Sequence, residues 1–380
     1  MQSDVLIVGG GVIGTACARA LARRGASVTL VDSGPKPGSA SLAAAGMLAP
    51  LAEAGPEDPM LGMAVRARDY YAELAPALVD EVGIDIGLQY QGILEVAFSE
   101  DEVVEVKKEV AWHRQCGFAA EWLSARELQD LAPGIAPEAL GAAYAPEDGA
   151  LNPLALLQAL ARSAKHAGAE FIRGEEVEQL LISGSQVGGV RTSVQDRTAA
   201  VVLIACGAWS GQIPGLPRPL SVQPVRGQMA AITWPDECPE MIVYGAGGYV
   251  MPQAGGAVAG STMENAGFEV TVTETGLEHL RAVVKQLLPP LGQVLFSRTW
   301  AGLRPCTPDG RPIIGPDPHF SGLWYATGHG RNGILLAGYT GELVAELHFG
   351  EEIEIDLAPI SPTRFWDWRW LQSRVRSRSE

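Results

Sequence analysis

The sequence predicts an α/β protein in which a doubly wound, Rossmann-like domain carries an inserted domain built on a mostly antiparallel sheet. Three observations support this fold class. The chain opens with a strand, a glycine-rich turn and a helix between residues 4 and 32, and two later segments, 151–177 and 199–210, return to similar patterns. Residues 222–296 instead contain several alternating strands. A chain of 380 residues is long enough for two such domains.

The N-terminal segment predicts a dinucleotide-binding unit. An apolar strand at Val5–Val8 meets the pattern GxGxxG, whose glycines are Gly9, Gly11 and Gly14. The first glycine allows a tight turn, the second lets the backbone approach a pyrophosphate, and the third lets helix and strand pack closely. The helix that follows presents free N–H groups to the phosphates. Asp32 ends the next strand, where it can accept a hydrogen bond from a ribose hydroxyl.

This segment leaves the kind of dinucleotide open between NAD and FAD. Asp32 disfavours NADP, because its charge would repel a 2′-phosphate. The loop at residues 33–51 is rich in small residues, unlike the next βα unit of a nicotinamide enzyme, so bare backbone there could lie against a flat ring. The alternative for this loop is a flexible linker.

The order of expected elements divides the chain into discontinuous domains. Helices are expected at 59–82, 100–116 and 124–131, from Asn152, and after the glycine-rich turn near residue 330. Further strands are expected at 92–99, from Glu170, and at 199–206, 224–234, 249–262, 269–274 and 323–328. We therefore assign residues 1–84, 146–221 and 297–380 to the nucleotide domain, and residues 85–145 and 222–296 to a substrate domain.

Composition restricts the partners of the protein. The net charge is −16, from 44 acidic and 28 basic residues, which argues against nucleic acid or an anionic membrane as a partner. The five cysteines occur singly, and none has metal-site spacing, so we expect no metal. No signal peptide or membrane span is visible, and a reducing cytoplasm is the expected location. A homo-oligomer is left open.

An arginine in the stretch WAGLRPCTPDGRPIIG suggests a substrate site. Arg304 lies among apolar and turn-forming residues, immediately before Pro305. An arginine in such surroundings often has a fixed anionic partner. The partner is either an internal carboxylate, such as Asp309 in the following turn, or the carboxylate of a substrate. A guanidinium can bind a carboxylate through two parallel hydrogen bonds, which suits the second role.

Five motifs in the same order give the chain a family resemblance. The N-terminal fingerprint, SLAAAGML, VVLIACGAWS, GLRPCTPDGRPIIG and TGHGRNGILLAGYTGELVAE together resemble the FAD-dependent D-amino acid oxidase superfamily. Within it, the chain is most similar to the glycine oxidase (ThiO-type) family, over residues 4–365. The resemblance implies non-covalently bound FAD and oxidation of an amine next to a carboxylate, with oxygen as the final acceptor.

The resemblance also implies roles for individual residues. It places Arg304 on the substrate carboxylate with Arg331 and Tyr249 nearby, and it has Met47 and Met263 narrow the cavity, although both methionines could equally be core residues. Together with the fingerprint glycines, it implies FAD contacts at Gly9, Gly11, Val12, Ile13, Gly14, Asp32, Ser33, Ala40, Ser41, Ala45, Gly46, Met47, Val177, His329, Gly330, Arg331, Asn332, Gly333, Ile334 and Leu335.

The expected activity is FAD-dependent oxidative deamination of glycine and other small amines, including sarcosine and D-alanine. The products would be a 2-oxo acid, ammonia or an amine, and hydrogen peroxide, and the glycine imine could supply thiamine thiazole synthesis. A flavin dehydrogenase with a different electron acceptor, a tRNA-side-chain oxidase and a non-catalytic dinucleotide-binding protein are the alternatives. The net charge of −16 weighs against the tRNA version. Residues 366–380 are expected to form a solvated tail.

Overall fold

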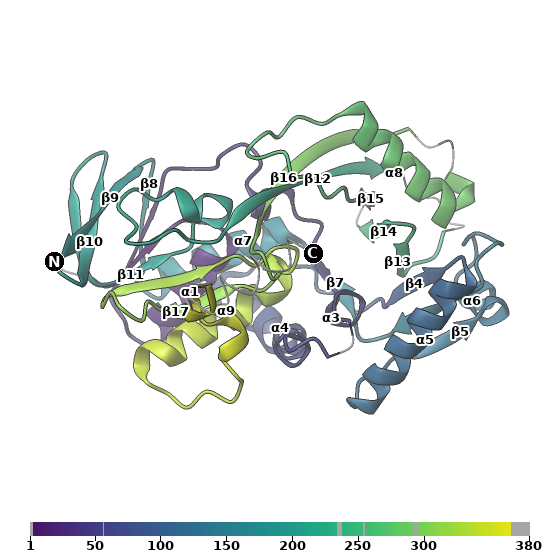
Figure 1. The fold of residues 1–380 in the computed structure, drawn as a ribbon, viewed down its shortest axis with the longest axis horizontal. Helices are drawn as coiled ribbons and strands as arrows, with labels where there is room; N and C mark the ends of the chain where they lie inside the picture. Colours follow the sequence, from purple (N-terminus) through teal and green to yellow (C-terminus); the bar gives the residue numbers. More distant parts are fainter. Residues whose placement is uncertain are drawn as a thin grey trace, which may run out of the picture.

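Two large sheets organise the protein and lie side by side, and the long strands β12 and β16 form the edge of the second sheet nearest the first (Figure 1). Each sheet has eight strands among the described residues. The expected α/β fold class is confirmed. The expected tail at 366–380 lies outside the described residues. The computed structural model describes residues 3–55, 57–233, 238–253, 255–291, 293 and 295–365.

The first sheet is the doubly wound one. Its strand order is β17-β18-β11-β1-β2-β8, and neighbouring strands run parallel except at the β17–β18 pair. Two further strands, β9 and β10, extend it antiparallel from β11. The strands are β1 (Ser3–Val8), β2 (Val28–Asp32), β8 (Glu170–Arg173), β9 (Val177–Ser183), β10 (Gln186–Thr192), β11 (Asp196–Ile204), β17 (Ile313–Pro316) and β18 (Leu323–Thr327).

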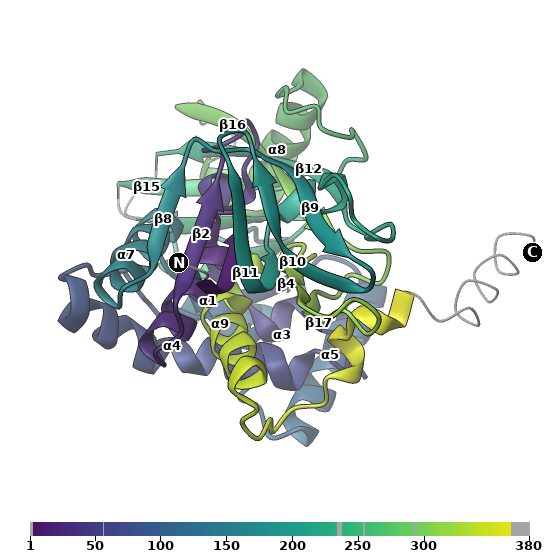
Figure 2. The same ribbon diagram turned by 90° about the vertical axis from the view of Figure 1, so that its left-hand side faces the viewer.

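Both faces of this sheet are covered, which is why β1 is apolar at every inner position. Because side chains alternate along a strand, Val5 and Ile7 join the core formed with the helices, whereas Leu6 and Val8 join the core on the side of β9 and β10. Figure 2 shows α9 and α4 on one side of these strands. The covering helices are α1 (Val12–Arg23), α4 (Leu61–Val82), α7 (Pro153–His166) and α9 (Gly333–Phe349).

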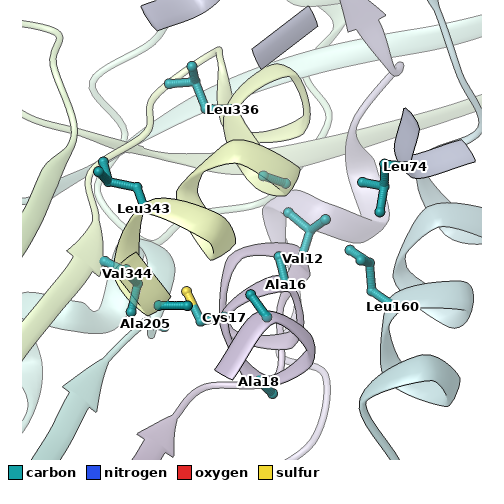
Figure 3. Close-up of a cluster of buried hydrophobic side chains, with 14 of the residues drawn as sticks. Val12, Ala16, Cys17, Ala18, Leu74, Leu160, Ala205, Leu336, Leu343 and Val344 are labelled. Carbon is teal, nitrogen blue, oxygen red and sulfur yellow. The ribbon is translucent and has the colours of Figure 1, made fainter. Parts of the chain in front are cut away.

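Small residues allow α1 and α9 to pack closely (Figure 3). Ala16 and Cys17 of α1 are buried against Leu343 and Val344 of α9. A Cβ at Gly341 would lie 2.7 Å from the carbonyl oxygen of Ala16, so a larger residue would push the two helices apart. This packing holds the start of α1 next to the start of α9, at the same edge of the sheet.

The second sheet has the order β16-β12-β15-β14-β13-β4-β6-β5. Among the described residues its pairings are antiparallel, except that β13 runs parallel to β4. Its first strand, β16, falls in the segment from residue 297 onward that we assigned to the nucleotide domain. The chain therefore returns from the second sheet to the first one strand later than expected, after β16. The strands are β4 (Ile93–Ala97), β5 (Glu121–Ser124), β6 (Gly141–Ala145), β12 (Gln223–Ile232), β13 (Ile242–Gly245), β14 (Gly248–Gln253), β15 (Gly256–Gly260) and β16 (Arg298–Cys306).

One expected strand of this domain is absent. Residues 269–273 form no strand, and α8 (Glu274–Leu287) begins where the expected strand would end. The Thr273 side chain accepts a hydrogen bond from the backbone of Gly276 and caps this helix. Leu280, Val284 and Leu287 follow at helical spacing and are buried. The N-cap and this spacing prevail over the β-branched residues before them.

Shorter elements connect the two sheets. The one-turn helices α2 and α3 and the strand β3 follow β2 of the first sheet in sequence and precede β4 of the second. The strand β7, which pairs with β3, follows β6 of the second sheet and precedes β8 of the first. In the described part of the chain, no helix is long and apolar enough to cross a membrane, and no three His, Cys, Asp or Glu side chains come together as metal ligands would. The elements are α2 (Ala40–Ala43), β3 (Met47–Leu48), α3 (Pro50–Glu53), α5 (Glu100–Gln115), α6 (Ala125–Leu131), β7 (Gly149–Ala150), and the 3₁₀ helices Gly207–Gln212, Pro289–Leu291, Ala358–Ile360 and Pro362–Phe365.

Candidate functional site

The glycine-rich turn between β1 and α1 depends on contacts that only glycine allows. Gly9 has φ of 111°, and a Cβ there would lie 2.5 Å from the carbonyl oxygen of Ala205, which follows β11. A Cβ at Gly14 would lie far inside van der Waals distance of the Gly9 carbonyl oxygen, so α1 packs directly on the turn. The Val12 N–H donates to the Ser41 hydroxyl at 3.0 Å. The helix therefore starts at the carboxyl ends of two parallel strands, where phosphates bind in such folds.

Asp32 ends β2 and borders the same region. Its carboxylate accepts hydrogen bonds from the backbone of Gly10 at 2.6 Å and of Gly34 at 2.7 Å. These bonds fix the glycine-rich turn against the loop after β2. They also hold the carboxylate at the cavity wall, where a ribose hydroxyl could reach it.

A cavity of about 270 Å³ begins at this turn and extends to the second sheet. The second sheet contributes Gly227, Met229, Tyr249 and Arg304 to its wall. Most residues expected to contact FAD also line it, from the glycine-rich turn, the loop after β2, β9 and the start of α9. They are Gly9, Gly11, Val12, Ile13, Asp32, Ser33, Ala40, Ser41, Ala45, Gly46, Met47, Val177, His329, Gly330, Arg331, Asn332, Gly333 and Ile334.

Two expected contact residues lie behind the cavity wall. Gly14 faces the carbonyl of Gly9 rather than the cavity, so its role is to let α1 approach the turn. Leu335 is fully buried in the core between α9 and its neighbouring helices. Both therefore support the wall without forming it.

Met263 does not narrow the cavity, contrary to expectation. Its side chain is 54% exposed and is not part of the cavity wall. The chain is extended here, so neighbouring side chains point to opposite faces: Thr262 is buried and Glu264 pairs with Arg226, whereas Met263 faces solvent. Met229, which is 4% exposed, lines the cavity instead.

Arg304 extends from β16 into the cavity. Its guanidinium donates hydrogen bonds to the carbonyl oxygen of Thr262 at 3.1 Å and to the hydroxyl of Ser261 at 2.5 Å. Within the residues that the structure describes, no carboxylate forms an ion pair with it. Burial lowers the pKa of this guanidinium, since little water reaches it. A half-buried cation that forms no ion pair with a described carboxylate is suited to bind an anion, even though the charge of Glu53 acts on it from a greater distance.

The internal partner considered for Arg304 is engaged elsewhere. Asp309 forms an ion pair with Arg364, at 2.8 Å between Oδ2 and Nε, and a second hydrogen bond of 3.2 Å joins the same two side chains. Despite burial, the hydrogen bonds and charge of Arg364 lower the pKa of Asp309. The Asp309 alternative is therefore wrong, because a C-terminal arginine far along the chain takes that carboxylate.

Arg331 has two partners that the sequence did not reveal. Its Nη2 lies 2.6 Å from Oε1 of Glu53 and 2.7 Å from the hydroxyl of Tyr244. The Glu53 side chain is only 11% exposed; burial raises its pKa, and the charges of Arg331 and Arg304 oppose that rise. Glu53 ends the one-turn helix α3, and nothing in the local pattern indicates that it faces the cavity. Tyr244 could have been suggested only as the hairpin partner of Tyr249.

Two further groups at the cavity wall are uncharged. Burial raises the pKa of Tyr249 to about 12, so its phenol stays protonated. Burial lowers the pKa of His329 to about 3, and its Nε2 lies 3.1 Å from the hydroxyl of Thr340. A neutral imidazole held in this way supports the turn before α9 and is a poor base.

This arrangement fits FAD. The glycines leave bare backbone at the start of α1 for a pyrophosphate, Asp32 lies where a ribose would, and the cavity extends from there to Arg304. Comparison with known proteins agrees: the family model described as FAD dependent oxidoreductase matches residues 4–347. The chain belongs to the FAD-dependent oxidoreductase family.

Relatives within this FAD-dependent oxidoreductase family include glycine oxidases. The glycine oxidase of Geobacillus kaustophilus (strain HTA426) is 36% identical over 365 residues, which are 95% of this chain and 97% of that protein. The glycine oxidase of Bacillus subtilis (strain 168) is 32% identical, over 93% and 95% of the two chains. The crystal structure of glycine oxidase from Geobacillus kaustophilus superimposes with a TM-score of 0.89 at 35% identity, over 96% of this chain and 99% of that one.

A further relative is named as a bifunctional protein. The bifunctional protein ThiO/ThiG of Trichormus variabilis (strain ATCC 29413 / PCC 7937) is 34% identical over 96% of this chain and 55% of that protein. These findings confirm the expected cofactor, FAD, and the expected class of enzyme, an FAD-dependent amino acid oxidase, at the level of the family. The roles of individual residues remain predictions.

Proposed function

We propose that this FAD-dependent oxidase oxidises small amino acids, with glycine, sarcosine and D-alanine as preferred substrates. The observation that carries the proposal is Arg304, a half-buried guanidinium at the cavity wall with no carboxylate partner within the described residues. A substrate carboxylate bound there would hold the α-carbon in a fixed place. FAD held by the glycine-rich turn and the start of α9 would supply the two-electron oxidation of that carbon, with oxygen as the final acceptor and hydrogen peroxide as its product.

The residues around Arg304 would set the size and charge of the substrate. Met47, Met229 and Tyr249 add apolar lining to the cavity that Arg304 enters, and we expect this lining to leave room for a short side chain only. Arg331 is neutralised by Glu53, so it would not compete with Arg304 for the carboxylate. The products would be a 2-oxo acid with ammonia or an amine. We also propose that the glycine imine supplies thiamine synthesis, on the basis of the ThiO/ThiG relatives.

Substrate preference tests this function. We expect glycine, sarcosine and D-alanine to bleach the flavin absorbance, and we expect kcat/KM for D-phenylalanine to lie well below that for glycine. Rapid mixing without oxygen measures bleaching, and peroxide formation in air measures turnover. Bleaching without peroxide would support the other function, a dehydrogenase with a different acceptor. A kcat/KM for D-phenylalanine above that for glycine would contradict the narrow cavity.

We expect the flavin to be bound without a covalent bond. Cys206 lines the cavity, but burial, followed by the charge of Asp32, raises the pKa of its thiol to about 12. Burial also raises the pKa of Cys306. Attack on a flavin requires the thiolate, so neither sulfur is activated. Acid should release all FAD from the yellow protein, and a fluorescent band that migrates with the chain on a denaturing gel would show the opposite.

We propose a cytoplasmic location for the protein. The described cysteines, Cys17, Cys116, Cys206, Cys238 and Cys306, form no disulfide with one another, which is compatible with a reducing cytoplasm. A small amino acid and oxygen are the proposed partners, and a homo-oligomer stays open.

A further inference from the structure

Arg304 is held in place by a segment that follows β15 and lies outside the strands of the second sheet. Both hydrogen-bond acceptors of its guanidinium, the Ser261 hydroxyl and the Thr262 carbonyl, lie just after β15 ends at Gly260. The position of this short segment therefore sets the position of the guanidinium. Contacts with β12 hold this segment in place.

The segment runs alongside β12 through backbone hydrogen bonds. Arg226 and Glu264 exchange them in both directions, at 2.9 and 3.0 Å. The backbone N–H of Gln228 donates to the Thr262 hydroxyl at 2.9 Å. The side chain of Thr262 is thus bonded to β12, while its backbone carbonyl accepts the hydrogen bond from Arg304.

Hydrogen bonds between side chains connect Glu264 to β12. Gln228, which is completely buried, donates to Oε1 of Glu264 at 2.6 Å, and Nε of Arg226 donates to Oε2 at 3.0 Å. Gln228 also exchanges hydrogen bonds with Thr273, the cap of α8, and Arg226 donates to the carbonyl of Thr271. Against the effect of burial, hydrogen bonds from Thr262, Arg226 and Gln228 lower the pKa of Glu264, so it is ionised at neutral pH.

This group of side chains lies on the far side of β12 from the cavity. Alternate residues of a strand face opposite sides, so Arg226 and Gln228 share one face and Gly227 has the other. Gly227 lines the cavity, and a Cβ there would overlap the Arg304 guanidinium. The guanidinium therefore lies directly over Gly227. Arg226, Gln228 and Glu264 do not line the cavity and would touch neither substrate nor cofactor.

We infer that Arg226, Gln228 and Glu264 form a positioning network that fixes the two acceptors of Arg304 and so aims its guanidinium at the substrate carboxylate. The inference rests on the proposed role of Arg304 in binding that carboxylate. Pre-organisation of this kind matters because a displacement of about 1 Å can lower the rate about 100-fold. Gly227 complements the network by leaving the space that the guanidinium occupies.

The test compares Glu264→Gln with the wild-type holoenzyme. Glycolate, the hydroxyl analogue of glycine, is titrated while the flavin absorbance is followed, and steady-state constants are measured with glycine. We expect Glu264→Gln to weaken glycolate binding and to raise KM for glycine by about 10- to 100-fold, with a smaller change in kcat. Turnover of glycine ethyl ester, whose carboxylate is masked, should stay near the wild-type rate, as should the FAD content.

Two further variants frame this result. Glu274→Gln alters an exposed carboxylate in the first turn of α8 that pairs with Arg281 and with no member of the network, and should leave glycolate binding unchanged. Gly227→Ala should displace the guanidinium directly, because the overlapping atoms end a flexible side chain, and should weaken glycolate binding at least as much as Glu264→Gln. If Glu264→Gln does not fold, Arg226→Lys, which keeps the charge but loses the forked geometry, takes its place.

The outcomes separate the inference from the proposed function. If the network variant binds glycolate as the wild type does while Arg304→Ala does not, the inference is overturned and the proposed function stands. If Arg304→Ala also binds glycolate normally, the proposed function itself fails. An equal loss of glycine and glycine ethyl ester turnover in the network variant would mean that the network only supports the fold, and would also overturn the inference.

Discussion

Replacement of Arg304 by alanine should abolish most activity on carboxylate substrates while the protein stays folded and yellow. Truncating one partner of a buried, hydrogen-bonded charge pair costs about 2–5 kcal/mol, which corresponds to a fall of about 30- to 5,000-fold in kcat/KM for glycine. The fold should survive, because in the described structure Arg304 donates hydrogen bonds only to Ser261 and Thr262, and Glu53, whose pKa its charge also lowers, keeps its ion pair with Arg331. Steady-state kinetics with glycine and D-alanine measure the loss.

Three comparisons show that the loss comes from the carboxylate. Arg304→Lys should recover little, since an ammonium cannot reproduce two parallel hydrogen bonds. Glycine ethyl ester should lose far less than glycine in the alanine variant. Arg364→Ala is the matched control. It removes an arginine whose partner, Asp309, lies five residues after Arg304, and neither Arg364 nor Asp309 lines the cavity. The kcat/KM for glycine should therefore stay near the wild-type value. Near-normal kcat/KM for glycine in Arg304→Ala would refute the role, and so would simple unfolding.

The part of the site that follows from local sequence is the dinucleotide end. The glycines, the start of α1 and Asp32 occur within one βαβ unit, so their spacing along the chain determines how they lie in space. The same is true of the N-cap at Asn152, whose side chain accepts hydrogen bonds from the first turn of α7 as expected. Each of these features depends on residues close together in the chain, at most 22 positions apart for the hydrogen bond between Gly10 and Asp32, and this is why they could be predicted.

The substrate end depends on contacts that no local pattern contains. Glu53 meets Arg331 across 278 positions, and Asp309 meets Arg364 across 55. The sequence therefore suggested the wrong partner for Asp309 and none for Glu53. The missed helix α8 has a different cause: its N-cap and apolar spacing are local signals, but the β-branched residues before Thr273 favour a strand, and hydrogen bonds with Arg226 and Gln228 hold residues 271–273 in another conformation.

Gly14→Ala should cost the protein its cofactor and much of its stability. A methyl group there would overlap the backbone carbonyl of Gly9, which cannot rotate away as a side chain could. Either α1 or the glycine-rich turn must move, and α1 is held in turn by its close packing on α9 (Figure 3). Overpacking of this kind costs about 1–3 kcal/mol or more. Thermal unfolding, with and without added FAD, should show a lower midpoint and little stabilisation by FAD.

A second helical glycine provides the matched control and completes the argument. Gly62 lies in the first turn of α4, is exposed, and has no atom within 4 Å of the position of an added Cβ. Gly62→Ala should therefore change stability by less than about 1 kcal/mol, in the stabilising direction, because alanine favours the helix. The two variants add the same methyl group, so a difference between them reports the contacts at Gly14, of which the one with the Gly9 carbonyl is the shortest. If Gly14→Ala retains FAD and unfolds at the same temperature as Gly62→Ala, the turn is not as tightly packed as the structure shows, and the pyrophosphate site proposed at the start of α1 loses its main support.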